Sequence, residues 1–168
     1  MTPSIINLSL LVLRSNLIFK KSLYFLLSII LAIHWNQSIT QAADAISLNA
    51  SNMAQPVVID GTSGGAIKAQ EIAQTTKTAT GFCDGYVSYQ PNHLLKLESF
   101  FAYLRLEINS QADTTIIIKG PGGVWCNDDA GTANPMIEGQ WQVGLYQVWI
   151  GSYYENTDHN YQIKITGK

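Results

Sequence analysis

The sequence predicts an all-β protein, an antiparallel β-sandwich of about seven or eight short strands, preceded by a signal peptide. Two observations indicate this fold class. From residue 82 onward, short β-prone runs alternate with turn residues at the close spacing typical of sandwiches. Beyond that residue, no stretch of useful length shows the 3.6-residue apolar period of a helix. The chain has 168 residues, which allows one domain, and an open barrel is the alternative fold.

The N-terminal segment carries the features of a secretory signal. Lys20 and Lys21 precede an uncharged apolar run of eleven residues, 23–33, which small residues follow. This run is shorter than the roughly 20 residues that a transmembrane helix needs. A basic flank, a short apolar core and a small-residue cleavage site are typical of a signal peptide. We therefore predict a signal peptide over residues 1–45.

The cleavage position and the first residues leave alternatives open. Small-x-small patterns place the cut after Ala42, Ala43 or Ala45. The stretch 5–19 is itself apolar and precedes the lysines, so either the true start lies downstream of Met1 or the segment stays as an anchor. With cleavage, we expect a secreted or periplasmic protein that keeps no membrane span.

Removal of the signal leaves an acidic domain. Of ten Lys and Arg residues, three precede the cut, and of twelve Asp and Glu residues, only Asp44 does. Seven basic residues against eleven acidic residues give 46–168 a net charge of −4. No basic patch is available to neutralise phosphates, so nucleic acid is excluded as a partner. A mildly acidic surface also suits a cation site.

The sequence contains two cysteines, Cys83 and Cys126, both after the signal. In an exported chain we expect them to form a disulfide, because the compartments outside the cytoplasm are oxidising. The loop of 43 positions would stabilise the fold by about 4 kcal/mol in the chain-entropy model. Two free buried thiols are the alternative.

Small polar residues predict a flexible linker over 46–55, and the sandwich domain is expected over 56–168. An apolar run at 57–59 predicts the first strand, which a glycine-rich turn ends. A second short strand or a helical turn is expected near 66–72, and a threonine-rich loop over 75–80.

The later strands follow from period two and from β-branched runs. Leucine and isoleucine alternate with charged residues over 104–108, which is typical of a strand with one wet face. A β-branched run at 114–119 ends at the turn signal Gly120-Pro121-Gly122-Gly123. The strands expected from residue 82 onward are 82–89, 95–97, 104–108, 114–119, 124–126, 145–150 and 161–165.

The turn at 120–123 sets a hairpin register that gathers acidic residues at the hairpin's open end. With Lys119 opposite Val124, residues Asp113, Asp128 and Asp129 come together there. Three carboxylates at one place must splay into water, raise their pKa values or hold a cation.

Oxygen ligands of this kind suit Ca²⁺, so we take Asp113, Asn127, Asp128 and Asp129 as the candidate calcium ligands. The twelve-residue loop of an EF-hand is absent from this segment. A solvated acidic loop, whose aspartates cap turns, is the alternative.

Aromatic residues are numerous for so small a domain. By parity, Tyr146, Val148 and Ile150 share one face of a strand, and Trp149 lies on the other face. If the first face is core, Trp149 is partly exposed. We take Trp149, Tyr153 and Tyr154 as candidate binding residues, since exposed aromatics form platforms for sugars or peptides. Cover for the second face of the sandwich is the alternative role.

Two features invite an enzymatic interpretation. Residues 61–65, Gly-Thr-Ser-Gly-Gly, resemble the serine environment of trypsin-like proteases, but no His–Asp pair precedes them. His93 and His159 could serve as general bases, yet neither has a convincing nucleophile partner in the sequence. We therefore expect a glycine-rich turn at 61–65 and a protein that is not an enzyme.

Two stretches carry a family resemblance, DTTIIIKGPGGVWCNDD at 113–129 and GLYQVWIGSY at 144–153. They resemble bacterial pre-peptidase C-terminal domains, which are related to the collagen-binding domains of clostridial collagenases, and most of all uncharacterised exported cyanobacterial proteins with such a unit. The resemblance covers about 56–168 and is strongest from Cys83 onward. It implies a jelly-roll-like sandwich, secretion and frequent Ca²⁺ dependence. This chain departs from the pattern in having no attached peptidase.

The expected function is that of an exported, non-catalytic module that binds an extracytoplasmic polysaccharide or protein surface. A structural or accessory envelope protein, associated with a separate secreted peptidase, is the second hypothesis. A small hydrolase is the third, and it requires His93 or His159 within reach of a serine or carboxylate. An exposed Trp149 would favour binding, whereas a buried Trp149 would favour a structural role.

Overall fold

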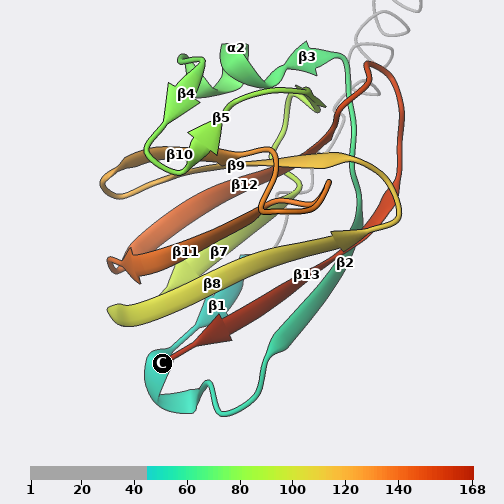
Figure 1. The fold of residues 1–168 in the computed structure, drawn as a ribbon. Coiled ribbons are helices and arrows are strands. Elements are labelled where there is room, and N and C mark those ends of the chain that lie inside the picture. The colour runs from blue at the N-terminus through green and yellow to red at the C-terminus, as the bar shows by residue number, and fades with distance from the viewer. Residues whose placement is uncertain (1–44) are drawn as a thin grey trace, which may run out of the picture. The chain divides into compact units, whose positions relative to one another are not determined.

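The computed structural model describes residues 45–168, so the predicted signal peptide, apart from Ala45, lies outside the described residues. Strands make up most of the regular secondary structure of the described part (Figure 1). The strands are β1 (Ile46–Leu48), β2 (Val57–Thr62), β3 (Ile67–Lys68), β4 (Lys77–Thr78), β5 (Gly81–Phe82), β6 (Tyr86–Val87), β7 (His93–Leu97), β8 (Phe101–Ser110), β9 (Thr114–Gly120), β10 (Gly123–Asn127), β11 (Met136–Trp141), β12 (Gly144–Ser152) and β13 (Asn160–Gly167). Two short helical turns accompany them, η2 (Ala50–Asn52) and α2 (Ala69–Ala73).

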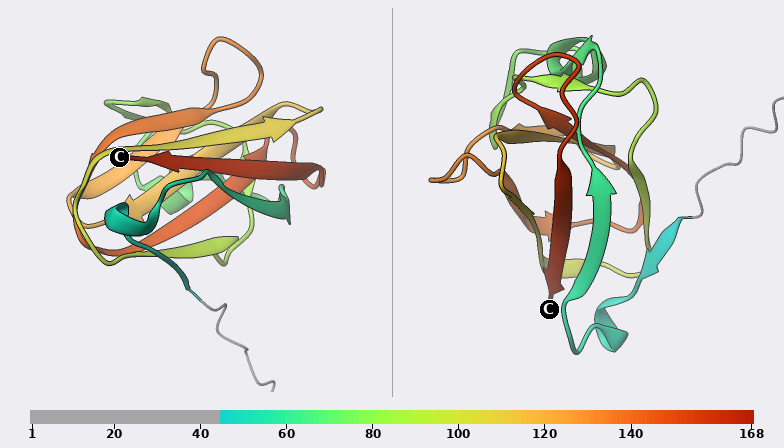
Figure 2. Two further views of the ribbon diagram at one scale, coloured as in Figure 1. Left: turned by 90° about the horizontal axis from the view of Figure 1, so that it is seen from below. Right: turned by 90° about the vertical axis from the view of Figure 1, so that its right-hand side faces the viewer.

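Two sheets form the layers of a sandwich, which confirms the predicted all-β fold class (Figure 1, Figure 2). The larger sheet contains seven strands, with β12 between β9 on one edge and β7 and β6 on the other. The smaller sheet has the strand order β11-β8-β13-β2. A separate two-stranded ribbon pairs β4 with β5.

The prediction of a purely antiparallel sandwich is wrong for one pair of strands, because β1 runs parallel to β7. Parallel neighbours require a long crossover connection. The chain between Leu48 and His93 supplies it, since it builds β2 in the smaller sheet before it returns to the larger one.

Alternate residues of the long strands fill the space between the two sheets, as the period-two pattern predicted. Leu104, Leu106 and Ile108 of β8 are at most 3% exposed, while Arg105 and Glu107 between them face outward to solvent. On β12, the parity prediction is confirmed for Tyr146, Val148 and Ile150, which all belong to this core. Burial of this apolar surface is the main source of the domain's stability.

The predicted linker at 46–55 is wrong in its first part. Ile46–Leu48 forms strand β1 along Leu95–Leu97 of β7, and Leu48 is 5% exposed in the core. The backbone N–H of Ala50 donates a hydrogen bond to Ser99 Oγ at 2.8 Å, which fixes the turn η2. Three residues are too few for a period-two pattern to stand out among small polar neighbours.

The segment after β2 follows the sequence prediction only in part. The expected short strand or helical turn near 66–72 is confirmed, because both β3 and α2 form there. The threonine-rich stretch 75–80 contains a short strand, β4, instead of a loop throughout. The single strand expected over 82–89 is divided into β5 and β6, because Gly85 between them has a φ of 84° that breaks the extended chain.

Residues 69–83, hereafter the capping segment, cover the outer face of the larger sheet (Figure 1). They comprise α2, β4, β5 and Cys83. A second apolar cluster lies between this segment and the sheet. Its buried residues are Ala69, Ala73, Cys83, Val87, Ile117, Cys126 and Trp149. The larger sheet is therefore buried on both faces where β9, β10 and β12 lie side by side.

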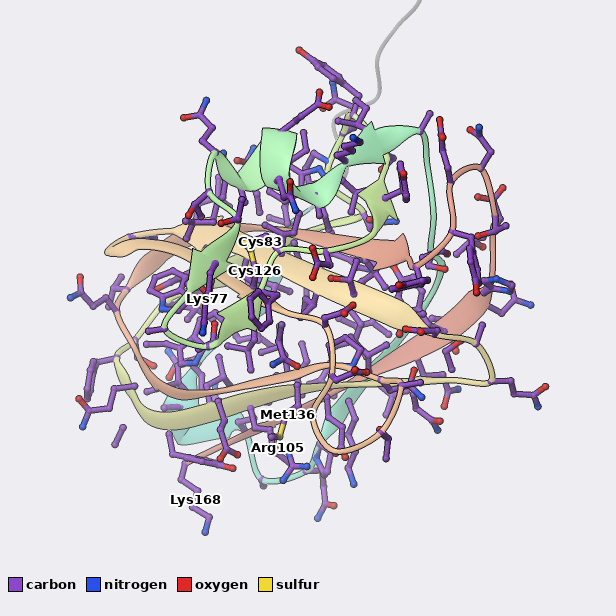
Figure 3. All side chains as sticks on the ribbon, turned by 45° about the horizontal axis from the view of Figure 1, so that its top comes forward. Lys77, Cys83, Arg105, Cys126, Met136 and Lys168 are labelled. Carbon is purple, nitrogen blue, oxygen red and sulfur yellow. A yellow bond between two sulfur atoms is a disulfide. The ribbon has the colours of Figure 1, made fainter. Side chains whose placement is uncertain are left out.

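The predicted disulfide between Cys83 and Cys126 is present and joins the capping segment to β10, with 5.1 Å between the two Cα atoms (Figure 3). Hydrogen bonds reinforce this junction at the free edge of β10. The N–H of Cys126 donates to Thr78 Oγ1 at 3.0 Å, and Thr80 Oγ1 donates to the carbonyl oxygen of Cys126 at 2.8 Å. Threonine hydroxyls thus satisfy an edge that would otherwise be open to pairing with another strand.

We predict that the double variant Cys83→Ser/Cys126→Ser lowers the free energy of unfolding by about 4 kcal/mol, because the unfolded chain regains the entropy of a 43-residue loop. Urea denaturation followed by far-UV circular dichroism measures the change. The control is the wild-type chain in reducing buffer, which should unfold at nearly the same urea concentration as the variant. A loss below about 1 kcal/mol would contradict the tethering role.

Candidate functional site

The hairpin register predicted from the turn at 120–123 is confirmed. Val124 pairs with Lys119, Trp125 with Ile118, and Asn127 with Ile116. Strand β10 ends at Asn127, so Asp128 and Asp129 leave the sheet at the hairpin's open end. Asp113 precedes β9 at the same end.

Asn127, one of the predicted ligands, has a structural role. It is 9% exposed, and both ends of its carboxamide are already used. The amide Nδ2 donates to the carbonyl oxygen of Thr80 at 2.8 Å, and Oδ1 accepts from the N–H of Met136 at 3.1 Å. This side chain therefore ties the capping segment and β11 to β10.

The aspartates form an acidic cluster of four, Asp84, Asp113, Asp128 and Asp129. Burial, together with the charges of Asp129, Asp113 and Asp84, raises the pKa of the Asp128 carboxyl to about 6. Burial and Asp129 also raise the pKa of Asp113. One oxygen each of Asp113 and Asp128, Oδ1, is buried without a hydrogen-bond partner within residues 45–168.

Asp84 was not among the candidate ligands predicted from the sequence. It joins the cluster because Cys83 brings the capping segment to β10. Gln70 Nε2 of α2 donates to Asp84 Oδ1 at 3.1 Å and holds the carboxylate in place. In this arrangement, the described residues form no group of three or more His, Cys, Asp or Glu side chains that could surround a metal ion.

The raised pKa of Asp128 makes a pH-dependent prediction. The fold prefers the neutral carboxyl of Asp128. The contribution of this carboxyl to the free energy of unfolding is therefore fully present below about pH 4 and is lost as the pH rises through 6. In chelator at neutral pH, Asp128→Asn should therefore raise the free energy of unfolding by about 1 kcal/mol, a figure reduced for the side chain's solvent exposure.

The gain from Asp128→Asn should disappear when urea denaturation is repeated at about pH 3, where the wild-type carboxyl is mostly neutral in both states. Glu98→Gln, which changes an exposed carboxylate between β7 and β8, is the control and should change little at either pH. A destabilised Asp128→Asn protein at neutral pH in chelator would contradict this account.

Trp149 does not lie on an exposed platform, contrary to the sequence prediction. It is 4% exposed, in the cluster beneath the capping segment, and its register neighbour Ile117 is fully buried. Parity placed Trp149 on the correct outer face of β12, but the pattern of one strand does not reveal what covers that face. Tyr153 and Tyr154 are 46% and 67% exposed, and their rings pack edge to face with their centroids 5.1 Å apart.

Burial of Trp149 predicts a large difference between two substitutions on one face of β12. Trp149→Ala should lower the free energy of unfolding by about 3–5 kcal/mol, because it leaves a cavity beneath the capping segment. Leu145→Ala, at a position that is 52% exposed, should change it by less than about 0.5 kcal/mol. Urea denaturation of both variants checks this, and equal small effects would show that the capping segment does not cover Trp149.

The residues that invited an enzymatic interpretation make hydrogen bonds within the fold. Ser63 is 3% exposed, and its hydroxyl shares a hydrogen bond with Ser152 Oγ at 2.8 Å. His159 hydrogen-bonds to the backbone and the hydroxyl of Ser63 through its own backbone atoms, not through its ring. His93 Nε2 lies 2.7 Å from the hydroxyl of Tyr161, so one hydrogen bond joins the two sheets across the core, and burial lowers the pKa of His93.

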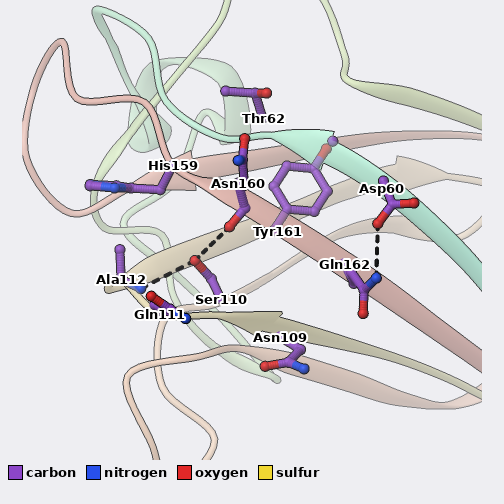
Figure 4. A pocket seen from close by; sticks show the side chains of 11 residues that line it. Asp60, Thr62, Asn109, Ser110, Gln111, Ala112, His159, Asn160, Tyr161 and Gln162 are labelled. Atoms are coloured by element: carbon purple, nitrogen blue, oxygen red, sulfur yellow. Dashed lines mark hydrogen bonds between the residues drawn. The ribbon is translucent and has the colours of Figure 1, made fainter.

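An open groove lies on the outer face of the smaller sheet, where β2, β13 and β8 run side by side (Figure 4). Its volume is about 1040 Å³. Its polar lining residues are Asp60, Thr62, Asn109, Ser110, Gln111, His159, Asn160 and Gln162. The sequence prediction missed this groove, although polar residues alternate with core residues along all three strands.

Comparison with known proteins gives similarity without a family assignment. No family model matches this chain. An uncharacterised protein of Synechococcus elongatus is 27% identical over 88 residues, which are 50% of this chain and 65% of that protein. The match thus spans less than two thirds of the relative's own length.

Two solved structures resemble this chain at low sequence identity. The pre-peptidase C-terminal domain of a collagenase from Bacillus anthracis is 10% identical, with a TM-score of 0.43 over 75% of this chain and 98% of that domain. Aeromonas hydrophila PliG, a periplasmic inhibitor of g-type lysozyme, is 8% identical, with a TM-score of 0.41 over 76% of this chain and 100% of PliG. A pre-peptidase C-terminal domain is among the solved structures similar to this chain, as the sequence resemblance predicted.

Within residues 45–168, no helix is long and apolar enough to cross a membrane.

Proposed function

We propose that this protein is an exported, non-catalytic β-sandwich module that binds a polysaccharide or a protein surface outside the cytoplasm. The observation that carries the proposal is the difference between the two outer faces of the sandwich. The capping segment buries much of the larger sheet, whereas the smaller sheet presents an open polar groove. A face that is left hollow and rich in hydrogen-bonding groups is suited to recognition.

The disulfide supports the extracytoplasmic location. Disulfides form and persist in oxidising compartments and are rare in the cytoplasm. Cys83 and Cys126 are both fully buried and joined, and no free cysteine occurs in the described residues. A location outside the cytoplasm also places the groove where extracellular polymers and proteins are available.

The side-chain geometry supports a non-catalytic role. Activation of a serine nucleophile needs a histidine ring within hydrogen-bond reach of its hydroxyl. The Ser63 hydroxyl instead meets Ser152 and the backbone of His159, and the ring of His93 is held by Tyr161. The buried hydrogen bonds of these residues serve the fold.

Calcium at the acidic cluster is part of this proposal. Asp113 and Asp128 each keep a buried oxygen without a partner, and the charge of Asp129 lies near both carboxylates. Carboxylate oxygens suit Ca²⁺, which would relieve their repulsion. The carboxylates do not surround a cation in the arrangement described above, so binding would require the loop after β10 to bring Asp113, Asp128 and Asp129 closer together. Calcium would then fix the loop after β10.

A structural or accessory role in the cell envelope, in association with a separate peptidase, is the second candidate. The burial of Trp149 favours it, because this aromatic residue serves the packing of the capping segment and not a binding platform. Tyr153 and Tyr154 remain exposed and offer a contact surface in either case.

An array of glycans, peptides and extracellular matrix proteins, probed with the full chain, tests the proposed function. We expect binding to at least one class, and we expect Asp128→Asn to remove any dependence on Ca²⁺ without removing binding in its absence. In a parallel thermal melt, addition of Ca²⁺ should raise the Tm of the wild type more than that of Asp128→Asn. No binding to any probe, with and without Ca²⁺, would contradict the binding function and leave the structural role.

A further inference from the structure

The groove on the smaller sheet is organised by strand register. Asp60 of β2 pairs with Gln162 of β13, and Gln162 pairs with Asn109 of β8. All three side chains are exposed on the same outer face. Because neighbouring strands lie about 4.8 Å apart, this row extends roughly 10 Å across the sheet. A second, smaller hollow of about 430 Å³ also uses Asn109 and Gln162 and extends the groove toward Asn134.

The groove's hydrogen-bonding groups are mostly free. Gln162 Nε2 donates to Asp60 Oδ1 at 2.9 Å, which orients both side chains and leaves the Gln162 amide oxygen open (Figure 4). The side chains of Asn109, Gln111 and Asn160 make no hydrogen bond to any residue between 45 and 168. A carboxamide offers two donors and two acceptor sites, so these three groups present both kinds to solvent.

The neighbouring part of the same face is different in character. Arg105 Nη2 lies 3.0 Å from Glu107 Oε1, and Tyr103 donates to Glu138 Oε2 at 2.8 Å. Arg105 and Glu107 are thus paired with each other, and Lys164 lines the smaller hollow. Asp60 is the one carboxylate that lines the main groove, so a charged ligand would find few ionic partners there.

We propose that the groove is a site for a neutral oligosaccharide, a ligand class that rests on the proposed binding function and makes it specific. Sugar hydroxyls both donate and accept hydrogen bonds, and the free carboxamides of Asn109, Gln111 and Asn160 match them in both respects. Asp60, held by Gln162, adds a strong acceptor for a hydroxyl pair. Tyr161 lines the groove but is 3% exposed, so recognition rests on hydrogen bonds and not on ring stacking.

An NMR titration of the full chain with cellohexaose, maltohexaose and the hexamer of N-acetylglucosamine tests the site. A hexagalacturonate arm supplies a charged oligosaccharide of similar length. We expect at least one neutral hexasaccharide to shift the amide signals of β2, β8 and β13. Asn109→Ala should weaken its affinity by about fivefold, and Asn109→Ala/Gln162→Ala should weaken it at least tenfold.

The matched control is Gln147→Ala, which removes an exposed carboxamide from the outer face of the larger sheet and should leave the affinity unchanged. Circular dichroism of each variant verifies that it is folded. Chemical-shift changes confined to the tyrosine pair at 153–154, or full affinity in the double variant, would show that the groove is not the binding site but would keep the binding function.

Binding of hexagalacturonate alone would contradict the proposal that the ligand is neutral. Failure of every oligosaccharide while array proteins bind would overturn the glycan site only, and failure on both would overturn the proposed function as well.

Discussion

The packing of the capping segment on the larger sheet is the interaction on which the rest of the structure depends. It turns the outer face around Ile117, Cys126 and Trp149 into a second apolar core, so that β9 is buried on both sides. It also covers the free edge of β10 through Thr78 and Thr80. The two sheets thereby become unequal, because the capping segment covers much of the larger sheet while the outer face of the smaller sheet stays open to solvent along β2, β13 and β8.

The disulfide connects this packing to the electrostatics of the acidic cluster. Cys126 lies on β10 two positions before Asp128, and Cys83 directly precedes Asp84. The bond therefore adds a fourth carboxylate to the three at the hairpin's open end, and burial together with the repulsion among them raises the pKa of Asp128. The stability gained from the disulfide is partly offset by this charge repulsion, which protonation of Asp128 relieves.

Local sequence patterns correctly predicted the structural features that depend on a single strand or a single turn. Period two identified the inward faces of β8 and β12, and the turn at 120–123 gave the register of β9 and β10. The pattern did not predict what covers Trp149, since α2 reaches that face from a segment some 75 positions earlier. For the same reason, Asp84 and the groove residues Asp60 and Asn109 come together only through tertiary pairing.

The central claim, that a tethered capping segment covers one sheet and leaves the other free, is tested most directly by hydrogen–deuterium exchange of the oxidised and reduced protein. Reduction should speed exchange in residues 69–83 and in β10, where the hydrogen bonds of Thr78 and Thr80 are made. The amides of β8 and β13, which pair with each other in the smaller sheet, should keep their protection. Faster exchange spread evenly over both sheets, or no change in the capping segment, would contradict the account.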